Sequence, residues 1–300
     1  MGYIGRFAPS PTGPLHFGSL VAALASYLDA KAHDGKWLVR IEDVDETRCN
    51  AAHSADILRS LQAFGLQWDG EIEIQSARKM LYDGAFQKLR SSGLTYACAC
   101  SRKEIADSAL AGREGLVYPG TCRSVGIDEN SQSIRLRTSS EIISFSDLVQ
   151  GETAQCIERE IGDFVLRRRD GLFAYQLAVV TDDAKQGVTH VVRGADLLDS
   201  TARQIYLQRL LGYRTPQYLH IPVALNAAGQ KLSKQTLAPA LSTSRHATHG
   251  VMLAALRFLG QSTENAEKAL PNGEFLASAV QNWSRGRIPR GRTKAVSPAP

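Results

Sequence analysis

The stretch Arg6 to Ser19, RFAPSPTGPLHFGS, decides the fold class of this 300-residue chain. It continues a short strand-like segment at Tyr3 to Ala8, and its prolines then impose an extended loop, because proline fixes φ and disfavours helix at the preceding residue. Apolar residues next recur at helical spacing up to Gly35, and WLVRI at 37–41 forms a second strand-like segment. This order of strand, loop, helix and strand predicts an α/β fold with a parallel sheet, in which ligands bind at the carboxyl ends of strands.

The remaining sequence divides into regions of different character. Turn clusters and short alternating segments mark 98–160 as an inserted subdomain between 1–97 and 161–236, which we predict to be the two halves of the α/β domain. A helical region follows at 237–284. The Arg-, Gly- and Pro-rich segment 285–300 is typical of a basic disordered tail.

Local patterns in the second half predict its strands and helices. We expect strands at 164–168, 173–179 and 190–193, and helices at 182–186 and 200–211. These elements continue the α/β pattern of the first half.

Charge separates the tail from the rest of the chain. The chain carries 35 basic and 30 acidic residues, and five of the basic residues but no acidic residue lie in 285–300. The remainder is therefore formally neutral, so that the net charge of +5 does not by itself indicate a nucleic-acid partner for the folded part.

The five cysteines and the N-terminal sequence indicate the compartment. An odd number of unevenly spaced cysteines is typical of a reducing environment. MGYIGRFAPSPTG lacks the apolar core of a signal peptide, and no apolar run approaches the roughly 20 residues that span a bilayer. We expect a cytoplasmic, monomeric protein without membrane contact.

The loop of the opening stretch suits nucleotide binding. Glycine at position 18 lets a ligand approach the backbone, the following helix N-terminus offers free N–H groups, and His16 can donate to a phosphate. The loop matches neither of the common Gly-rich phosphate-binding motifs. On these residues alone, a proline-rich turn capped by histidine is an equally good interpretation.

A second loop, KLSKQ at 231–235, carries two lysines three residues apart. Their ammonium groups can neutralise the charge that develops as pyrophosphate leaves a triphosphate. A lysine pair in a loop is also commonly a solvated surface.

Together the two loops resemble the HIGH and KMSKS elements of class I aminoacyl-tRNA synthetases, with Ser19, Leu232 and Gln235 departing from the pattern. In order along the chain, FAPSPTGPLHFGSL, LVRIEDVDETR (38–48), HVVRGADLLDSTARQ (190–204) and KLSKQ resemble the glutamyl-tRNA synthetase catalytic domain. The resemblance implies a Rossmann-like parallel sheet and activation of L-glutamate to glutamyl-adenylate by ATP with Mg²⁺. It implies catalytic roles for His16, Gly18, Lys231 and Lys234, with His16, Gly18 and Lys234 contacting ATP.

The chemistry of glutamate is consistent with this resemblance. Two carboxylates need cationic anchors, which Arg6 and Arg193 can supply, and Glu42 can bind the ammonium group. The resemblance further assigns Ala8, Ser10 and Tyr175 to the glutamate site. Without it, surface ion pairs of Glu42 with Arg40 or Arg48, and of Arg193 with Asp196, would be the preferred interpretations.

Cys98, Cys100, Tyr118 and Cys122 form a candidate zinc site in the inserted subdomain. Zinc prefers four tetrahedral ligands, and thiolates supply most of the affinity. Buried cysteines with one free thiol are an equally good interpretation from composition, but the arrangement resembles a zinc site of some glutamyl-tRNA synthetases. That resemblance implies one structural Zn²⁺, with Cys49 and Cys156 as ordinary thiols.

The short C-terminal part narrows the resemblance. Only 65 residues follow Gln235, which is too few for a domain that reads an anticodon, and 237–284 resembles a helical stem-contact region. The chain thus resembles the short glutamyl-queuosine tRNA(Asp) synthetases of this family, which implies transfer of glutamate to queuosine in the tRNA(Asp) anticodon. The alternative is a truncated conventional synthetase that charges a tRNA 3′ end.

Overall fold

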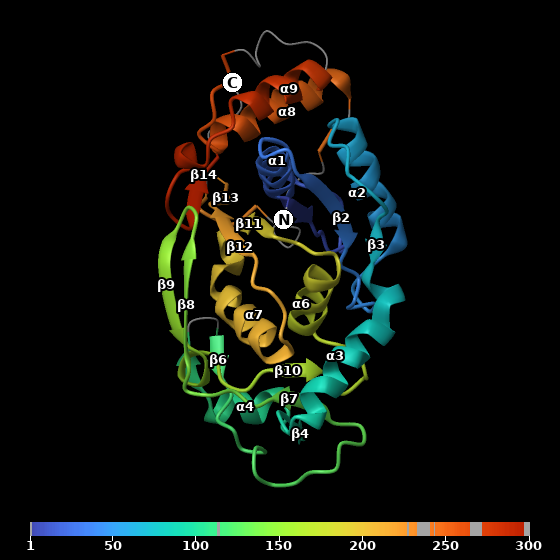
Figure 1. The fold of residues 1–300 in the computed structure, drawn as a ribbon, viewed down its shortest axis with the longest axis vertical. Coiled ribbons are helices and arrows are strands. Elements are labelled where there is room, and N and C mark those ends of the chain that lie inside the picture. Colours follow the sequence, from blue (N-terminus) through green and yellow to red (C-terminus); the bar gives the residue numbers. More distant parts are fainter. Residues whose placement is uncertain are drawn as a thin grey trace.

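The computed structural model has three tiers along its longest axis. Most of the inserted region lies at one end, the central α/β unit in the middle and two C-terminal helices at the other end (Figure 1). The structure describes residues 2–112, 115–226, 228–232, 241–242, 244–264 and 272–296.

A parallel sheet forms the centre of the molecule. The first set of strands is β1 (Ile4–Phe7), β2 (Lys36–Ile41) and β3 (Glu73–Ile74), and the second begins with β11 (His190–Gly194) and β12 (Gln217–Ile221). Among these five strands, hydrogen-bonded neighbours are parallel. The backbone N–H of Thr189 donates to the carbonyl of Ile4 over 2.9 Å, which places β11 beside β1. The predicted parallel α/β fold is confirmed.

Helices pack around this sheet, and their apolar faces form the core. Helix α1 buries Leu20, Leu24 and Leu28 between the sheet and α8, whereas α3, α6 and α7 enclose a second cluster. The helices of this tier are α1 (Phe17–Lys31), α2 (Ala51–Ala63), α3 (Lys79–Ser91), α6 (Tyr175–Lys185) and α7 (Leu198–Leu211), with 3-10 turns η1 (Gln75–Arg78) and η2 (Ala195–Leu197).

One predicted strand is wrong. Residues 173–179 do not form a strand, because α6 begins at Tyr175 and continues through the predicted helix at 182–186 to Lys185. A short apolar run such as LAVV fits a buried strand or a buried helix equally well, and eight residues of α6 are buried.

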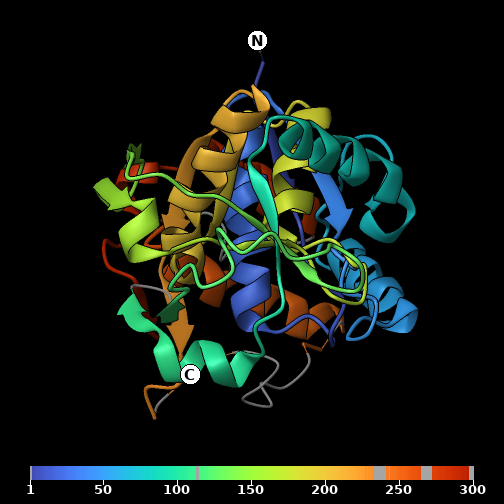
Figure 2. The same cartoon turned by 90° about the horizontal axis from the view of Figure 1, so that it is seen from below.

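The inserted region combines a small antiparallel sheet with a hairpin. Strands β4 (Thr95–Cys98), β7 (Ser133–Leu136) and β10 (Val165–Arg167) form the sheet, whereas β8 (Ile142–Asp147) and β9 (Gly151–Cys156) extend the central sheet beside β12. Figure 2 shows this tier (green and teal) in front of the central unit. The remaining elements are α4 (Arg102–Ser108), β5 (Leu110–Gly112), β6 (Gly115–Val117) and α5 (Ile157–Glu160). The two regions exchange strands, and the boundaries at 97/98 and 160/161 stay predictions.

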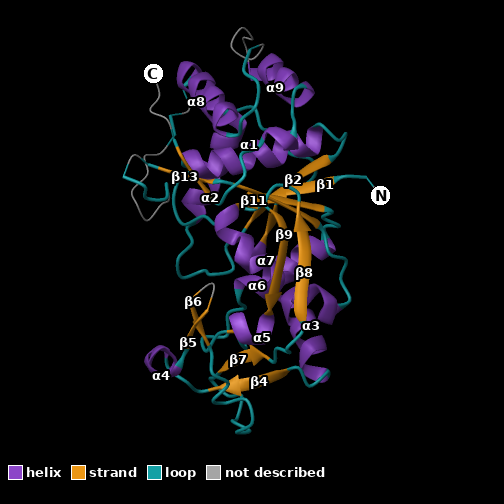
Figure 3. Cartoon of the chain, turned by 90° about the vertical axis from the view of Figure 1, so that its left-hand side faces the viewer, coloured by secondary structure: helices purple, strands orange, loops and turns teal. Residues whose placement is uncertain are grey.

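The predicted disorder of the tail is wrong for residues 285–296. After helices α8 (Arg245–Phe258) and α9 (Asn272–Gln281), the chain forms a 3-10 turn, η4 (Arg285–Arg287), and strand β14 (Thr293–Ala295). Strand β14 pairs in parallel with β13 (Val223–Leu225). Figure 3 shows α8 and α9 at the end of the molecule opposite β4 and β7.

Acidic residues of the body hold this segment in place. Arg285 makes two hydrogen bonds, of 2.7 and 3.0 Å, to the buried Asp29, which also accepts from Tyr3 and Trp283. Arg292 makes an equivalent pair of bonds to Asp199. The segment contains no acidic residue, but its partners lie far away in the sequence. Within the described part of the chain, no helix is both long and apolar enough to span a membrane.

Candidate active site

The carboxyl ends of β1, β2 and β11 surround a cavity of about 510 Å³. This volume lies within the usual range of small-molecule sites. The cavity brings together every described residue predicted for catalysis, ATP or glutamate: Arg6, Ala8, Ser10, His16, Gly18, Glu42, Tyr175, Arg193 and Lys231. The prediction for Lys234 lies outside the described residues.

Helix α1 begins at one wall of the cavity, and His16 is its N-cap. The backbone N–H of Ser19 donates to Nδ1 of His16 over 3.3 Å, so that Nε2 carries the proton and can donate to Ser19 Oγ at 2.9 Å. Ser19, where the family motif has a second histidine, thus fixes the orientation of the first. The free N–H groups and positive dipole end of α1 favour an anion here.

Residues 231 and 232 of the second loop lie against the start of α1. A Cβ added to Gly18 would lie 3.2 Å from the carbonyl oxygen of Leu232, so that glycine permits this close approach. Lys231 Nζ is 2.6 Å from Asp196 Oδ2, an ion pair at the cavity rim. The lysine side chain is held there rather than extending into solvent alone.

A dense ionic network forms the Arg6 wall of the cavity. Arg6 Nε lies 3.3 Å from Asp183 Oδ1, and the same oxygen lies 2.8 Å from the fully buried Arg40. Arg40 also lies 3.0 Å from Glu42. The predicted alternative of an ion pair between Glu42 and Arg40 therefore exists, but as a buried contact at the cavity and not on the surface.

Glu42 and Tyr175 lie close enough to influence each other's ionisation. Burial raises the pKa of Glu42, and the charges of Arg40 and Arg6 oppose this effect. Burial likewise raises the pKa of Tyr175, and the charge of Glu42 adds to it. Tyr175 therefore presents a neutral phenol at neutral pH, and a cation placed beside Glu42 would favour the ionised carboxylate.

Neutral groups hold the guanidinium of Arg193 on the opposite wall. It donates to His220 Nε2 over 3.0 Å, to Gln204 Oε1 over 2.9 Å and to Thr201 Oγ1 over 2.9 Å. Asp196 pairs with Lys231 instead, so the alternative of an ion pair between Arg193 and Asp196 is wrong.

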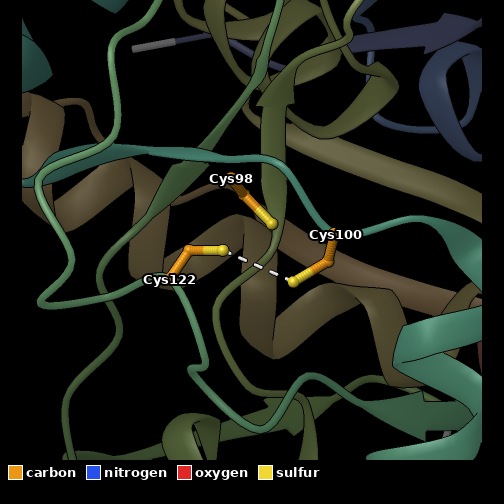
Figure 4. A group of neighbouring side chains, drawn as sticks. All are labelled: Cys98, Cys100 and Cys122. Carbon is orange, nitrogen blue, oxygen red and sulfur yellow. Dashed lines mark hydrogen bonds between the residues drawn. The ribbon is translucent and has the colours of Figure 1, made fainter.

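Three cysteines meet in the inserted region (Figure 4). The sulfur atoms of Cys98, Cys100 and Cys122 all lie within 4.8 Å of one another, and those of Cys100 and Cys122 are 3.4 Å apart. The hydroxyl of Tyr118 lies 3.4 Å from Cys98 Sγ and 3.5 Å from Cys100 Sγ. The four predicted metal ligands thus form one cluster.

The sequence matches the family "tRNA synthetases class I (E and Q), catalytic domain" over residues 4–288. The chain belongs to this family. It is 55% identical over 291 residues to a glutamyl-Q tRNA(Asp) synthetase of Dechloromonas aromatica, and 50% identical over 292 residues to one of Neisseria meningitidis. The alignments cover 96% of this chain and 96% and 98% of those proteins.

Solved structures agree on the fold of this class I synthetase. A glutamate tRNA ligase from Elizabethkingia meningosepticum superimposes with a TM-score of 0.81 at 23% identity. The match covers 99% of this chain and 67% of that ligase, and a glutamate-tRNA synthetase from Elizabethkingia anophelis gives the same score and identity.

Several residues that line or support the synthetase cavity escaped prediction. Asp183 and His220 contact Arg6 and Arg193, but they lie inside an apolar helix and a strand, where nothing local distinguishes them from ordinary polar residues. Thr12 and Ser19 line the cavity and lie within the quoted motif, so the motif itself was the available signal.

Proposed function

We propose that the protein activates L-glutamate with ATP and transfers the glutamyl group to queuosine in the anticodon of tRNA(Asp). The observation that carries this proposal is the cavity, which combines the guanidinium groups of Arg6 and Arg193 with the carboxylate of Glu42 beside the N-terminus of α1, while its other carboxylate, Asp196, is paired with Lys231. This set matches the two carboxylates and one ammonium group of glutamate. The full-length similarity to glutamyl-Q tRNA(Asp) synthetases supports the choice of nucleic-acid acceptor.

The activation step requires the glutamate carboxylate to approach the α-phosphorus of ATP in line with the departing pyrophosphate. A carboxylate oxygen of glutamate attacks the α-phosphorus of ATP, forms glutamyl-adenylate and displaces pyrophosphate. His16, the N-terminus of α1 and Lys231 line the cavity, and in this proposal they bind the phosphates together with the predicted cation Lys234. Mg²⁺ bound with ATP would neutralise phosphate charge.

The transfer step uses the same cavity. A hydroxyl of the queuosine diol attacks the acyl carbon of glutamyl-adenylate, loses its proton and releases AMP. The product is an ester, as in ordinary tRNA charging, and only the acceptor hydroxyl differs.

The test uses labelled glutamate, ATP and tRNA from cells that make or lack queuosine. We expect glutamate-dependent exchange of pyrophosphate into ATP without tRNA, and label on tRNA only when queuosine is present. Nuclease digestion locates the label. Label on the 3′ end would favour a conventional charging enzyme, and absence of exchange would favour a binding module without catalysis.

We further propose that Cys98, Cys100, Tyr118 and Cys122 bind one structural Zn²⁺. Three pairs of ligand atoms are 3.4 to 3.5 Å apart and all three sulfur atoms lie within 4.8 Å of one another, close enough for one Zn²⁺ with Zn–S bonds of about 2.3 Å. The backbone N–H of Cys122 donates to the Tyr118 hydroxyl over 2.9 Å, and the guanidinium of Arg135 lies 3.8 Å from the ring centre. Both contacts would stabilise a phenolate ligand.

The thiol chemistry supports this donor set. Burial raises the pKa of Cys122, but hydrogen bonds from Tyr118 and from the backbone of Ala99 outweigh it and bring the pKa to about 7. Four protein ligands would leave no coordination position for substrate, which favours a structural role.

Metal analysis tests the zinc site. We expect about one zinc per chain in the purified protein, and loss of that zinc in Cys122→Ser. Cys49→Ser and Cys156→Ser are matched controls, because their thiols lie outside the cluster and reach the backbone carbonyl oxygens of Glu42 and Ser140. Equal zinc in all three variants would contradict the assignment.

A further inference from the structure

A buried chain of hydrogen bonds lies behind Arg193, away from the cavity. Asp147 Oδ2 is 2.6 Å from Nδ1 of His220, and Nε2 of His220 is 3.0 Å from Nε of Arg193. The three residues come from β8, β12 and β11, which are consecutive strands of one sheet. Their exposed fractions are 3%, 0% and 5%, so that water does not compete for these bonds.

The surroundings of Asp147 determine the direction of these bonds. Its Oδ1 accepts backbone N–H groups of Val149, Gln150 and His220, which keep the carboxylate ionised and fixed. The other oxygen, Oδ2, therefore accepts the Nδ1 proton of His220, and the Nε2 lone pair faces Arg193.

His220 is neutral in the folded protein at neutral pH. Burial lowers the pKa of its imidazole; the hydrogen bond to Asp147 opposes this, the charge of Arg193 adds to it, and the pKa is about 4. A protonated ring would place an N–H group against the N–H of Arg193, and the contact would be lost. The neutral ring can accept this bond throughout the physiological range.

A neutral acceptor serves Arg193 better than a carboxylate would. Asp and Glu residues neutralise Arg6 and Arg40, but none of those in the described part of the chain lies within 4.0 Å of the Arg193 guanidinium nitrogens. The bonds to His220, Gln204 and Thr201 fix the plane of the guanidinium and leave its charge available to an anion in the cavity.

We infer that His220, oriented by Asp147, is a positioning residue that fixes Arg193 for binding a carboxylate of the amino-acid substrate. The inference rests on the proposed function, because it takes glutamate as the ligand of this wall. It adds a specific role for two residues that do not touch the cavity themselves.

Two substitutions distinguish the roles of the two imidazole nitrogen atoms of His220. His220→Gln places its amide near the former Nε2 and can still accept from Arg193, whereas His220→Asn places its amide near the former Nδ1 and can reach only Asp147. We expect His220→Asn to raise the KM for glutamate by about ten- to a hundredfold, the effect of a lost hydrogen bond to a charged group. His220→Gln should restore the KM to within about threefold of the original, for the same reason.

Asp147→Asn tests the second link. An amide at this position can donate to Nδ1, which moves the ring proton to Nε2 and turns it against Arg193. We expect a rise in the KM for glutamate in the same direction as for His220→Asn. In all three variants the KM for ATP should be unchanged, and thermal unfolding verifies that each remains folded.

Pyrophosphate exchange with varied glutamate and varied ATP gives both constants. If the unaltered protein exchanges but His220→Asn and His220→Gln share the same KM for glutamate, the positioning role is wrong while the proposed function stands. An equal rise in both KM values would indicate a purely structural role and would also overturn it. If the unaltered protein shows no glutamate-dependent exchange, the proposed function fails and the inference fails with it.

Discussion

Two walls of the cavity each hold one arginine, Arg6 by charged side chains and Arg193 by neutral ones. The Arg6 wall combines three guanidinium groups with four carboxylates, those of Arg6, Arg40, Arg78, Glu42, Glu73, Asp182 and Asp183. The Arg193 wall uses an imidazole, an amide and a hydroxyl, none of them charged at neutral pH. The first wall carries no excess of positive charge, whereas the second keeps the full positive charge of Arg193. Electrostatic recognition of an anionic substrate is therefore expected to depend mostly on the second wall.

The largest effect should come from Arg193→Ala. Loss of this charge removes the principal anion contact, and we expect glutamate-dependent pyrophosphate exchange to fall on the order of a thousandfold. The variant should remain folded, because the groups it leaves behind are neutral. Arg59→Ala, on the exposed face of α2, is the control. Unchanged exchange would contradict the assignment of the wall and of the substrate.

Asp183→Asn should affect stability most. It leaves Arg6 buried without a charged partner, and removing one partner of a buried pair typically lowers the free energy of unfolding by about 3–5 kcal/mol. Gln204→Ala on the other wall removes the bonds with Arg193 and Gln176 but leaves no pair of opposite charges broken, and it should cost less, about 2 kcal/mol. Urea unfolding measures the decrease in the free energy of unfolding for both variants. Equal decreases would contradict the proposed difference between the two walls.

The two walls should respond to acid in different pH ranges. The pKa of His220 is about 4 in the folded chain and 6.5 in the unfolded chain, so the unfolded chain binds the proton first as the pH falls. The free energy of unfolding should therefore decrease between about pH 6.5 and 4, by at most about 3 kcal/mol. In His220→Gln the free energy of unfolding should not show the part of this decrease that comes from the imidazole. A pH profile identical to that of the unaltered protein would contradict the neutral state of the ring.

Asp183 titrates at lower pH than His220. Burial raises the pKa of its carboxyl, but Arg6 and Arg40 outweigh it and hold the pKa below the ordinary value of 3.8. A depressed carboxyl pKa adds stability at pH values above the ordinary pKa, and this stability is lost as the pH falls through the folded value. The pair of Arg6 and Asp183 should therefore persist to lower pH than the contact between His220 and Arg193.

The smallest effect should come from Gly194→Ala. A Cβ at this position would collide with Oδ1 of Asp196 and displace it from Lys231. Because the ion pair is partly exposed, it contributes about 1 kcal/mol or less, and we expect a two- to fivefold rise in the KM for glutamate or ATP. Gly84→Ala, where an added Cβ contacts nothing, is the control. A loss of pyrophosphate exchange as large as that expected for Arg193→Ala would show that Asp196 belongs to the binding site itself.

The sequence predicted the cavity because its motifs are local. The segments around Arg6, Glu42 and Arg193 each end a strand, and parallel strands place their carboxyl ends at one edge of the sheet. Assigning each motif to the end of a strand was therefore sufficient to predict that their residues lie at the same edge of the sheet.

The groups that support the cavity could not be found in the same way. Asp183 acts on Arg6 across 177 positions, and Asp147 acts on His220 across 73. Such pairs leave no periodic pattern. The same difficulty misled the interpretation of the tail, where Arg285 meets Asp29 across 256 positions. Because the acidic partners of this basic segment lie far away in the sequence, its local composition wrongly indicates disorder.

The pairing of β14 with β13 has a consequence for synthesis on the ribosome. A nascent chain of 232 residues already contains every described residue of the cavity, but it lacks both the strand that covers β13 and the arginine that neutralises Asp29. Until residues 285–295 emerge, one sheet edge stays open and one carboxylate stays buried without a cation. Residues 285–295 must therefore be synthesised before the pairing of β13 with β14 and the ion pair of Arg285 with Asp29 can form.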